Sequence, residues 1–286
     1  MILPKGCLYY IHMGKTGGGT INKWLYSIIP HHFSFQGQFD GTERLTGMAS
    51  INEATQKLNA LRPRRKKALK LVTGHLPLPL LTQLPQPAQC ITVIREPIDR
   101  ELSSFYYLKT IGGDREEYFK NLTIAQYATD ISAADNYQVR ILSGLEELNP
   151  VWKKNITYPS IQGRTDLLEL AKENLKKYFV AVGSLEKLDE FALTLSKLMQ
   201  NKAPIDLGKE NVTHTRTSHQ AISEHELAIL KIKIDLDMAL YEWINTVEAQ
   251  AFFKTNLSQQ TYPSFFRRLI EKINFKITWW CEYIFG

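Results

Sequence analysis

The sequence is poor in cysteine, and it has neither a charged leader with an apolar core nor a membrane anchor ahead of its first apolar segment, near Leu8. Its cysteines, Cys7, Cys90 and Cys281, are odd in number and far apart in a chain of 286 residues. This pattern favours buried free thiols over a disulfide framework. Internal repeats, low-complexity tracts and zinc-like ligand spacing are also missing. We therefore expect a cytoplasmic protein.

Charge is unevenly placed along a chain whose formal net charge is +6, a balance that suits an anionic ligand. The basic run from Arg62 to Lys67 is interpreted as a solvated loop, with attraction of an anionic substrate or lipid as the alternative. The tail 256–286 has apolar residues at helical spacing with arginine and lysine between them, and it is too short and too charged to span a bilayer. Such a basic amphipathic helix either lies on an anionic membrane surface, here peripheral to the inner membrane, or docks on the core or at a homodimer interface.

The first of two informative segments combines a predicted strand, Leu8 to Met13, with a glycine-rich turn and the start of a helix. Glycines let backbone N–H groups approach an anion without interference from a Cβ atom, and a helix start adds unpaired N–H donors and the positive end of its dipole. The candidate anion ligands of this loop are Lys15, Thr16, Gly17, Gly18, Gly19 and Thr20. In an ATP-type loop the lysine follows the glycines, whereas Lys15 precedes them. The alternative interpretation is a glycine-rich turn with an incidental lysine.

The second segment runs from Cys90 to Ser103. A predicted strand at 90–94 ends at Arg95, and Pro97 suits the start of the helix that follows. Arg95 would then lie at the carboxyl end of a strand, where ligands bind in open α/β sheets, with Ser103 about two helical turns further on. An arginine and a serine hydroxyl can hold one phosphate together. The alternative is that Arg95 and Arg100 pair with neighbouring carboxylates on a solvated surface.

Together these loops predict a site for a nucleotide with phosphates at both ends, and their residues carry a family resemblance. Lys15-Thr16-Gly17-Gly18-x-Thr20 resembles the 5′-phosphosulfate loop of the carbohydrate sulfotransferases that include heparan sulfate 2-O-sulfotransferases and their bacterial relatives. Arg95-x-Pro97-x-x-Arg100-x-x-Ser103 resembles that family's 3′-phosphate loop. Three shorter segments, at 74–77, 135–140 and 182–186, follow in the family's order, and the resemblance covers roughly residues 8–220. The family usually has proline where this chain has Gly14, and threonine or serine where it has Gly19.

Alternating strands and helices predict an α/β fold with a parallel sheet. The resemblance implies a P-loop-NTPase-like three-layer fold, with a central parallel sheet flanked by helices and a helical C-terminal extension. We expect a sulfotransferase domain at 1–255 and the basic tail at 256–286. Strands are predicted near 8–13, 69–73, 90–94 and 178–182. Helices are predicted near 20–29, 50–60, 98–110, 123–131, 134–143, 166–177 and 186–200, with a long helical pattern from 220 to 255.

The resemblance also implies a reaction. The sulfuryl group of 3′-phosphoadenosine 5′-phosphosulfate (PAPS) would pass to a hydroxyl acceptor without a metal, with Lys15 stabilising the leaving phosphate. His75 is the candidate general base because imidazole titrates near neutral pH and because it matches a histidine that relatives use in this role. The alternative is a histidine that only forms hydrogen bonds at the sheet edge, and His12 is expected to be structural. The acceptor class is a glycan, a glycolipid or a small molecule, and no nucleic-acid partner is expected.

Three further residues are candidate ligands. Asn136 and Arg140 share a helix face and are candidates for contact with the acceptor or the donor, with internal helix-to-loop pairing as the alternative. Arg216 lies in a segment, 211–216, that resembles the family's late loop near the donor. Two other function classes stay open. A P-loop kinase would need a lysine after the glycines and an acidic magnesium ligand after a strand, and a non-catalytic nucleotide-binding, membrane-associated protein is supported by the basic tail.

Overall fold

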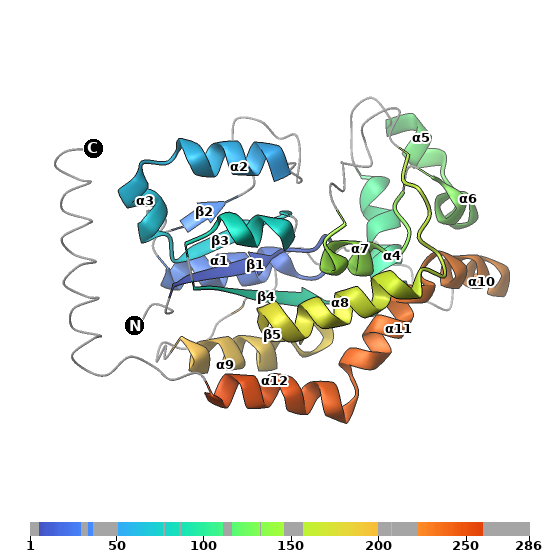
Figure 1. Cartoon of the computed structure of the whole chain (residues 1–286). Coiled ribbons are helices and arrows are strands. Elements are labelled where there is room, and N and C mark those ends of the chain that lie inside the picture. The colour runs from blue at the N-terminus through green and yellow to red at the C-terminus, as the bar shows by residue number, and fades with distance from the viewer. Residues whose placement is uncertain are drawn as a thin grey trace.

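The computed structural model describes residues 6–29, 34–36, 51–76, 78–85, 87–110, 116–131, 133–145, 157–199, 207 and 222–259. Its centre is a five-stranded sheet in the order β2-β3-β1-β4-β5, in which every neighbouring pair is parallel (Figure 1). The strands are β1 (Cys7–Ile11), β2 (Ser34–Gln36), β3 (Leu71–Gly74), β4 (Ala88–Ile94) and β5 (Phe179–Ser184). The predicted α/β fold with a parallel sheet is confirmed.

The central strands are mostly apolar because both faces of the sheet are covered. Every residue of β1 and β3 is buried, as is typical of parallel strands between two helical layers. Successive side chains of β1 point to opposite faces, so Leu8 and Tyr10 join one apolar cluster, whereas Tyr9 and Ile11 join the other.

Helices complete a three-layer arrangement around this sheet. On one face, the helices α1 (Gly18–Ile28) and α9 (Leu188–Leu198) pack against Leu8 and Tyr10. The other face is covered by α2 (Ile51–Ala60), the 3₁₀ helix η2 (Leu78–Gln83), α7 (Tyr137–Ser143), α8 (Thr165–Tyr178), α11 (Asp235–Ile244) and α12 (Val247–Gln259). The predicted tail 256–286 overlaps the last turn of α12 and otherwise lies outside the described residues.

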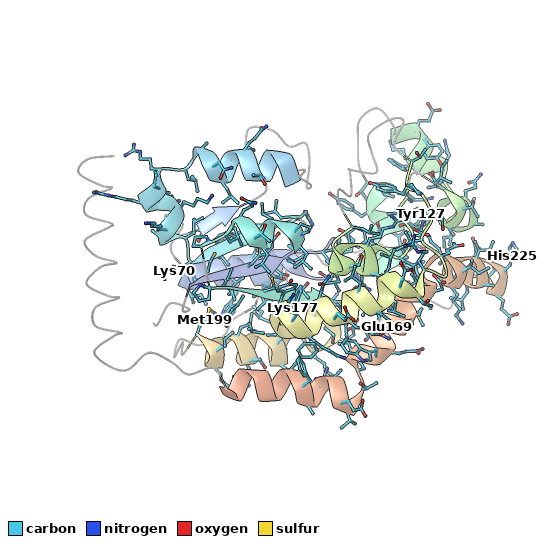
Figure 2. The ribbon with its side chains drawn as sticks, viewed as in Figure 1. Lys70, Tyr127, Glu169, Lys177, Met199 and His225 are labelled. Carbon is cyan, nitrogen blue, oxygen red and sulfur yellow. The ribbon has the colours of Figure 1, made fainter. Side chains whose placement is uncertain are left out.

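A separate helical lobe lies beyond the carboxyl end of β4 (Figure 1). It consists of α4 (Pro97–Leu108), α5 (Glu116–Asn121), α6 (Ile124–Thr129) and α10 (Glu224–Lys233). These helices enclose a third apolar cluster, which includes the buried Tyr127 (Figure 2). The lobe therefore extends the molecule on the side where the strands end.

Several local predictions need correction. The basic run is helical rather than a loop, because Pro63 suits the first turn of α3 (Pro63–Ala68), although none of the residues of this helix is buried. The long helical pattern from 220 to 255 is divided into α10, α11 and α12. Two elements were not predicted: β2, which has only three residues, and α5.

Cys7 and Cys90 are buried free thiols, as predicted, whereas Cys281 and Arg216 lie outside the described residues. None of the helices in the described ranges has both the length and the apolar character that crossing a bilayer requires.

Candidate active site

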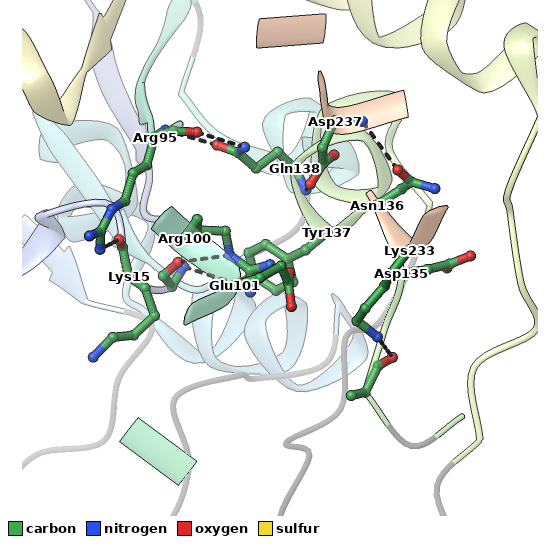
Figure 3. A network of polar contacts seen from close by, with 12 residues as sticks. Lys15, Arg95, Arg100, Glu101, Asp135, Asn136, Tyr137, Gln138, Lys233 and Asp237 are labelled. Carbon is green, nitrogen blue, oxygen red and sulfur yellow. Dashed lines mark hydrogen bonds and ion pairs between the residues drawn. The ribbon is translucent and has the colours of Figure 1, made fainter. Parts of the chain in front are cut away.

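The carboxyl ends of β1 and β4 bring the two predicted phosphate loops together. These strands are neighbours in the sheet, yet the chain leaves β1 toward β2 at one edge and leaves β4 toward β5 at the other. In open α/β sheets, ligands bind outside the carboxyl ends of two such strands. The loops meet directly, because Arg95 Nη1 donates a hydrogen bond to the Lys15 carbonyl over 3.0 Å and Arg100 Nε lies 3.5 Å from the Gly14 carbonyl (Figure 3).

The loop after β1 turns through left-handed backbone at Lys15, with φ of 68°, and at Gly17, with φ of 78°. The Thr16 hydroxyl, a predicted anion ligand, donates to the Met13 carbonyl over 2.9 Å and closes the turn. Helix α1 then begins at Gly18, so the N–H groups of its first turn, including those of Gly19 and Thr20, lack intrahelical acceptors. These groups are donors suited to an anion.

Three cationic side chains, those of Lys15, Arg95 and Arg100, lie close together where the two loops meet. Burial, together with the positive charges of Arg95 and Arg100, lowers the pKa of Lys15 below its ordinary value. Lys15 Nζ lies 4.1 Å from the centre of the Tyr107 ring, a cation–π contact that keeps the ammonium in place. A bound anion would relieve the repulsion among the three groups, so this cluster fits a phosphate or sulfate ligand.

Arg100 has a buried carboxylate beside it, since it forms an ion pair with Glu101, and both side chains are almost fully inaccessible to solvent. Pairing of Arg100 with a neighbouring carboxylate is the alternative that the sequence left open. The pair lies inside the protein, however, and not on a solvated surface. Glu96 instead begins α4, where its side chain accepts a hydrogen bond from the Asp99 N–H over 2.7 Å. Ser103 follows one turn after Arg100 on α4 and is partly exposed.

His75 follows β3 and stacks on His12, with ring centres 4.2 Å apart and an interplanar angle of 27°. Its Nδ1 atom is buried without a hydrogen-bond partner among the described residues. Burial lowers the pKa of His75 to about 4, against a smaller opposite effect of a hydrogen bond with the His12 backbone. The imidazole is therefore neutral at pH 7 and binds a proton only at a pH well below that.

His12 connects His75 to the glycine-rich loop. A Cβ atom added to Gly18 would lie 1.7 Å from a carbon of the His12 ring, so only glycine fits at this start of α1. His12 Nδ1 lies 3.4 Å from Asn22 Nδ2, and the side-chain oxygen Oδ1 of Asn22 accepts a hydrogen bond from the Thr73 hydroxyl. His12 thus places the His75 ring next to the loop that carries Lys15.

The lowered pKa of His75 makes stability depend on pH. The unfolded imidazole binds a proton near pH 6.5 and the folded one only near pH 4, so the free energy of unfolding decreases as the pH falls through this range. We expect the loss attributable to His75 to be ~1–3 kcal/mol. Denaturant unfolding of wild type and His75→Asn at pH 7 and pH 4.5 measures it. A decrease of the same size in both proteins would contradict the assignment.

Two further candidate ligands, Asn136 just before α7 and Arg140 within it, form hydrogen bonds inside the protein. Asn136 is fully buried; its side-chain oxygen accepts hydrogen bonds from the N–H groups of Leu236 and Asp237 over 2.9 and 3.1 Å. Arg140 pairs with Asp135 and donates to the Pro159 carbonyl. These contacts are the internal pairing that the sequence left open as the alternative to ligand binding.

Two residues between Asn136 and Arg140 were not predicted to belong to the site. Tyr137 and Gln138 contact the two loops directly, but their sequence signal, a position inside the segment 135–140, did not separate them from their neighbours. The described residues contain no group of three or more histidine, cysteine, aspartate or glutamate side chains arranged to hold a metal ion.

Comparison with known proteins adds no assignment. No protein-family model matches this chain, and no curated protein matches its sequence.

Proposed function

We propose that this protein is a PAPS-dependent sulfotransferase with a P-loop-NTPase-like sheet, and that its acceptor is a hydroxyl group of a glycan, glycolipid or small molecule. The observation that carries the proposal is the meeting of the two predicted phosphate loops at the carboxyl ends of β1 and β4, where the Arg95 side chain of one loop donates a hydrogen bond to the Lys15 backbone of the other. A nucleotide with phosphates on both sides of its ribose has one anion for each loop. The resemblance of the two loops to those of sulfotransferases supports the same donor.

The proposed reaction is an in-line displacement at sulfur. The acceptor oxygen forms a bond to sulfur while the bond between sulfur and the 5′-phosphate oxygen breaks, leaving adenosine 3′,5′-bisphosphate and a sulfate ester. His75 takes the hydroxyl proton, and the Lys15 ammonium neutralises the charge that develops on the bridging oxygen. As in phosphoryl transfer, the protein contributes mainly positioning and electrostatics.

The residue that follows β4, Arg95, argues against a P-loop kinase. A kinase of the P-loop class would hold magnesium with a carboxylate near a strand end, whereas β4 is followed by Arg95, whose guanidinium donates to the backbone of Lys15. The next residue, Glu96, uses its carboxylate to accept a hydrogen bond from the Asp99 N–H at the start of α4. A cation at Arg95 suits the second phosphate of the proposed donor.

Arg95→Ala is expected to weaken binding of adenosine 3′,5′-bisphosphate by ~1.5–3 kcal/mol, the range for hydrogen bonds to charged groups. Adenosine 5′-phosphate should be affected much less, because it lacks the anion assigned to Arg95. Isothermal titration calorimetry measures the affinities of the wild type and the variant for both nucleotides. Arg164→Ala is the matched control, since that arginine pairs with Asp166 on the surface. Equal weakening of the two nucleotides would show that Arg95 does not hold the 3′-phosphate.

The donor class is tested by titrating the wild-type protein with adenosine 3′,5′-bisphosphate and with ATP, each with and without magnesium. Tight, magnesium-independent binding of the bisphosphate supports a sulfotransferase, whereas a preference for ATP with magnesium supports a kinase and overturns the proposal. Incubation with PAPS and a panel of glycans, glycolipids and small alcohols then identifies the acceptor through release of the bisphosphate.

A further inference from the structure

The first turn of α7 contacts both anion loops through adjacent residues (Figure 3). Tyr137 Oη accepts a hydrogen bond from the Gly14 N–H over 3.0 Å. The Gln138 side chain binds both backbone groups of Arg95: its oxygen accepts from the Arg95 N–H, and its nitrogen donates to the Arg95 carbonyl, each over 3.0 Å. One helical turn therefore connects the loop after β1 to the loop after β4.

This turn is itself held by α11. Asp237 accepts hydrogen bonds from the N–H groups of Gln138 and Val139 over 3.1 and 2.8 Å, and so caps α7. In return, Asn136 caps α11 through the N–H groups of Leu236 and Asp237. The side chains of Asn136, Gln138 and Asp237 are all buried. Each helix thus satisfies the unpaired N–H groups of the other, which makes the turn a rigid support.

These contacts restrict the backbone of each loop. Gln138 hydrogen-bonds to the peptide groups of Arg95 and holds the backbone that follows β4, while Arg95 Nη1 donates to the Lys15 carbonyl. The Arg100 guanidinium stacks over the Tyr137 ring, with Cζ 3.9 Å from the ring centre. A substitution in this turn would therefore change the distance between the loops that carry Lys15 and Arg95, without removing either cationic side chain.

We propose that Tyr137 and Gln138 form a bracket that sets the separation of the two anion loops, and that this separation selects a nucleotide with both 3′ and 5′ anionic groups over one with a single group. The inference rests on the proposed function and adds the basis of donor selection. A second anion strengthens binding only when the spacing of its site matches the ligand. Tyr137 and Gln138 act through the loops and are positioning residues.

The test compares the affinities of adenosine 3′,5′-bisphosphate and adenosine 5′-phosphate. Gln138→Met has similar length and removes both hydrogen bonds to Arg95. We expect the preference for the bisphosphate to decrease by roughly 10-fold, about 1.4 kcal/mol, while affinity for the 5′-phosphate changes little. Tyr137→Phe should weaken both nucleotides, because both use the loop that Tyr137 holds. Gln162→Met, at an exposed glutamine, is the matched control and should leave the preference unchanged.

Thermal unfolding of each variant shows whether it folds. If Gln138→Met does not fold, Gln138→Glu decides the matter, because glutamate keeps the acceptor for the Arg95 N–H but cannot donate to its carbonyl in the ionised form. A smaller decrease in preference is expected there. An unchanged preference in a folded Gln138 variant would overturn the bracket and leave the proposed function standing. Failure of the wild-type protein to bind the bisphosphate would instead overturn the proposed function.

Discussion

Lys15→Ala is expected to lower kcat by roughly 10²–10³, the cost of removing one group that stabilises developing charge. The bridging oxygen gains negative charge only as the bond to sulfur breaks, so the contribution of the ammonium is largest in the transition state. The structure places Lys15 at the turn where α1 begins and keeps its Nζ against the Tyr107 ring. Steady-state kinetics with PAPS and an identified acceptor measure the effect.

Lys109→Ala is the control for this experiment. Lys109 also lies over an aromatic ring, with Nζ 4.9 Å from the centre of Phe105, but its ammonium donates a hydrogen bond to the Lys120 carbonyl and is not part of the cationic cluster. Its replacement should leave kcat nearly unchanged. If Lys15→Ala raised only the KM for the donor, Lys15 would contribute equally to the ground state and the transition state, and the role assigned to it would be wrong.

His75→Ala and His75→Asn are expected to reduce turnover by roughly 10²–10⁴, the usual contribution of a general base. Asparagine keeps part of the hydrogen-bonding capacity but cannot take the proton, so both variants should be slow. Affinity for adenosine 3′,5′-bisphosphate should change little, because His75 is assigned to the acceptor side of the reaction. Turnover and calorimetric affinity, measured on the same preparations, separate these effects.

His225→Ala serves as the histidine control, because His225 is exposed on α10, away from the sheet (Figure 2). Near-normal turnover of His75→Asn would show that the imidazole only orients the site. The proton would then need another acceptor, and a carboxylate in the acceptor pocket would be the next candidate.

The sequence was sufficient to locate the two loops, because it shows both the strands and their ends. Continuous apolar runs predicted β1 and β4, and parallel strands that share a sheet bring their carboxyl ends to one edge. Lys15 and Arg95 were therefore expected to lie together, although they are 80 residues apart in the chain. The short strand β2 offered no comparable signal, because three residues do not establish a period.

The supports of the site were not predictable in the same way. Periodicity indicates which face of an element is buried, but it does not identify the partner, so nothing in the sequence paired Gln138 with Arg95 or Asp237 with α7. Gly14 is a similar case. The sequence shows only that glycine stands at a position before Lys15, whereas the structure shows that its N–H, which a proline would lack, is donated to Tyr137. Gly18 is required by the His12 ring, a contact that a run of glycines does not reveal.

The reciprocal caps of α7 and α11 affect the order in which the protein folds during its synthesis. Asn136 and Leu236 are 100 residues apart, so the ribosome finishes both anion loops and α7 long before it makes the helix that holds them. Contacts of such long range close late, because the intervening chain must first lose conformational freedom. A nascent or truncated chain that ends before α11 would thus carry Lys15, Arg95 and Gln138 without a fixed spacing between the loops. Nucleotide binding would then begin only when nearly the whole chain has been synthesised.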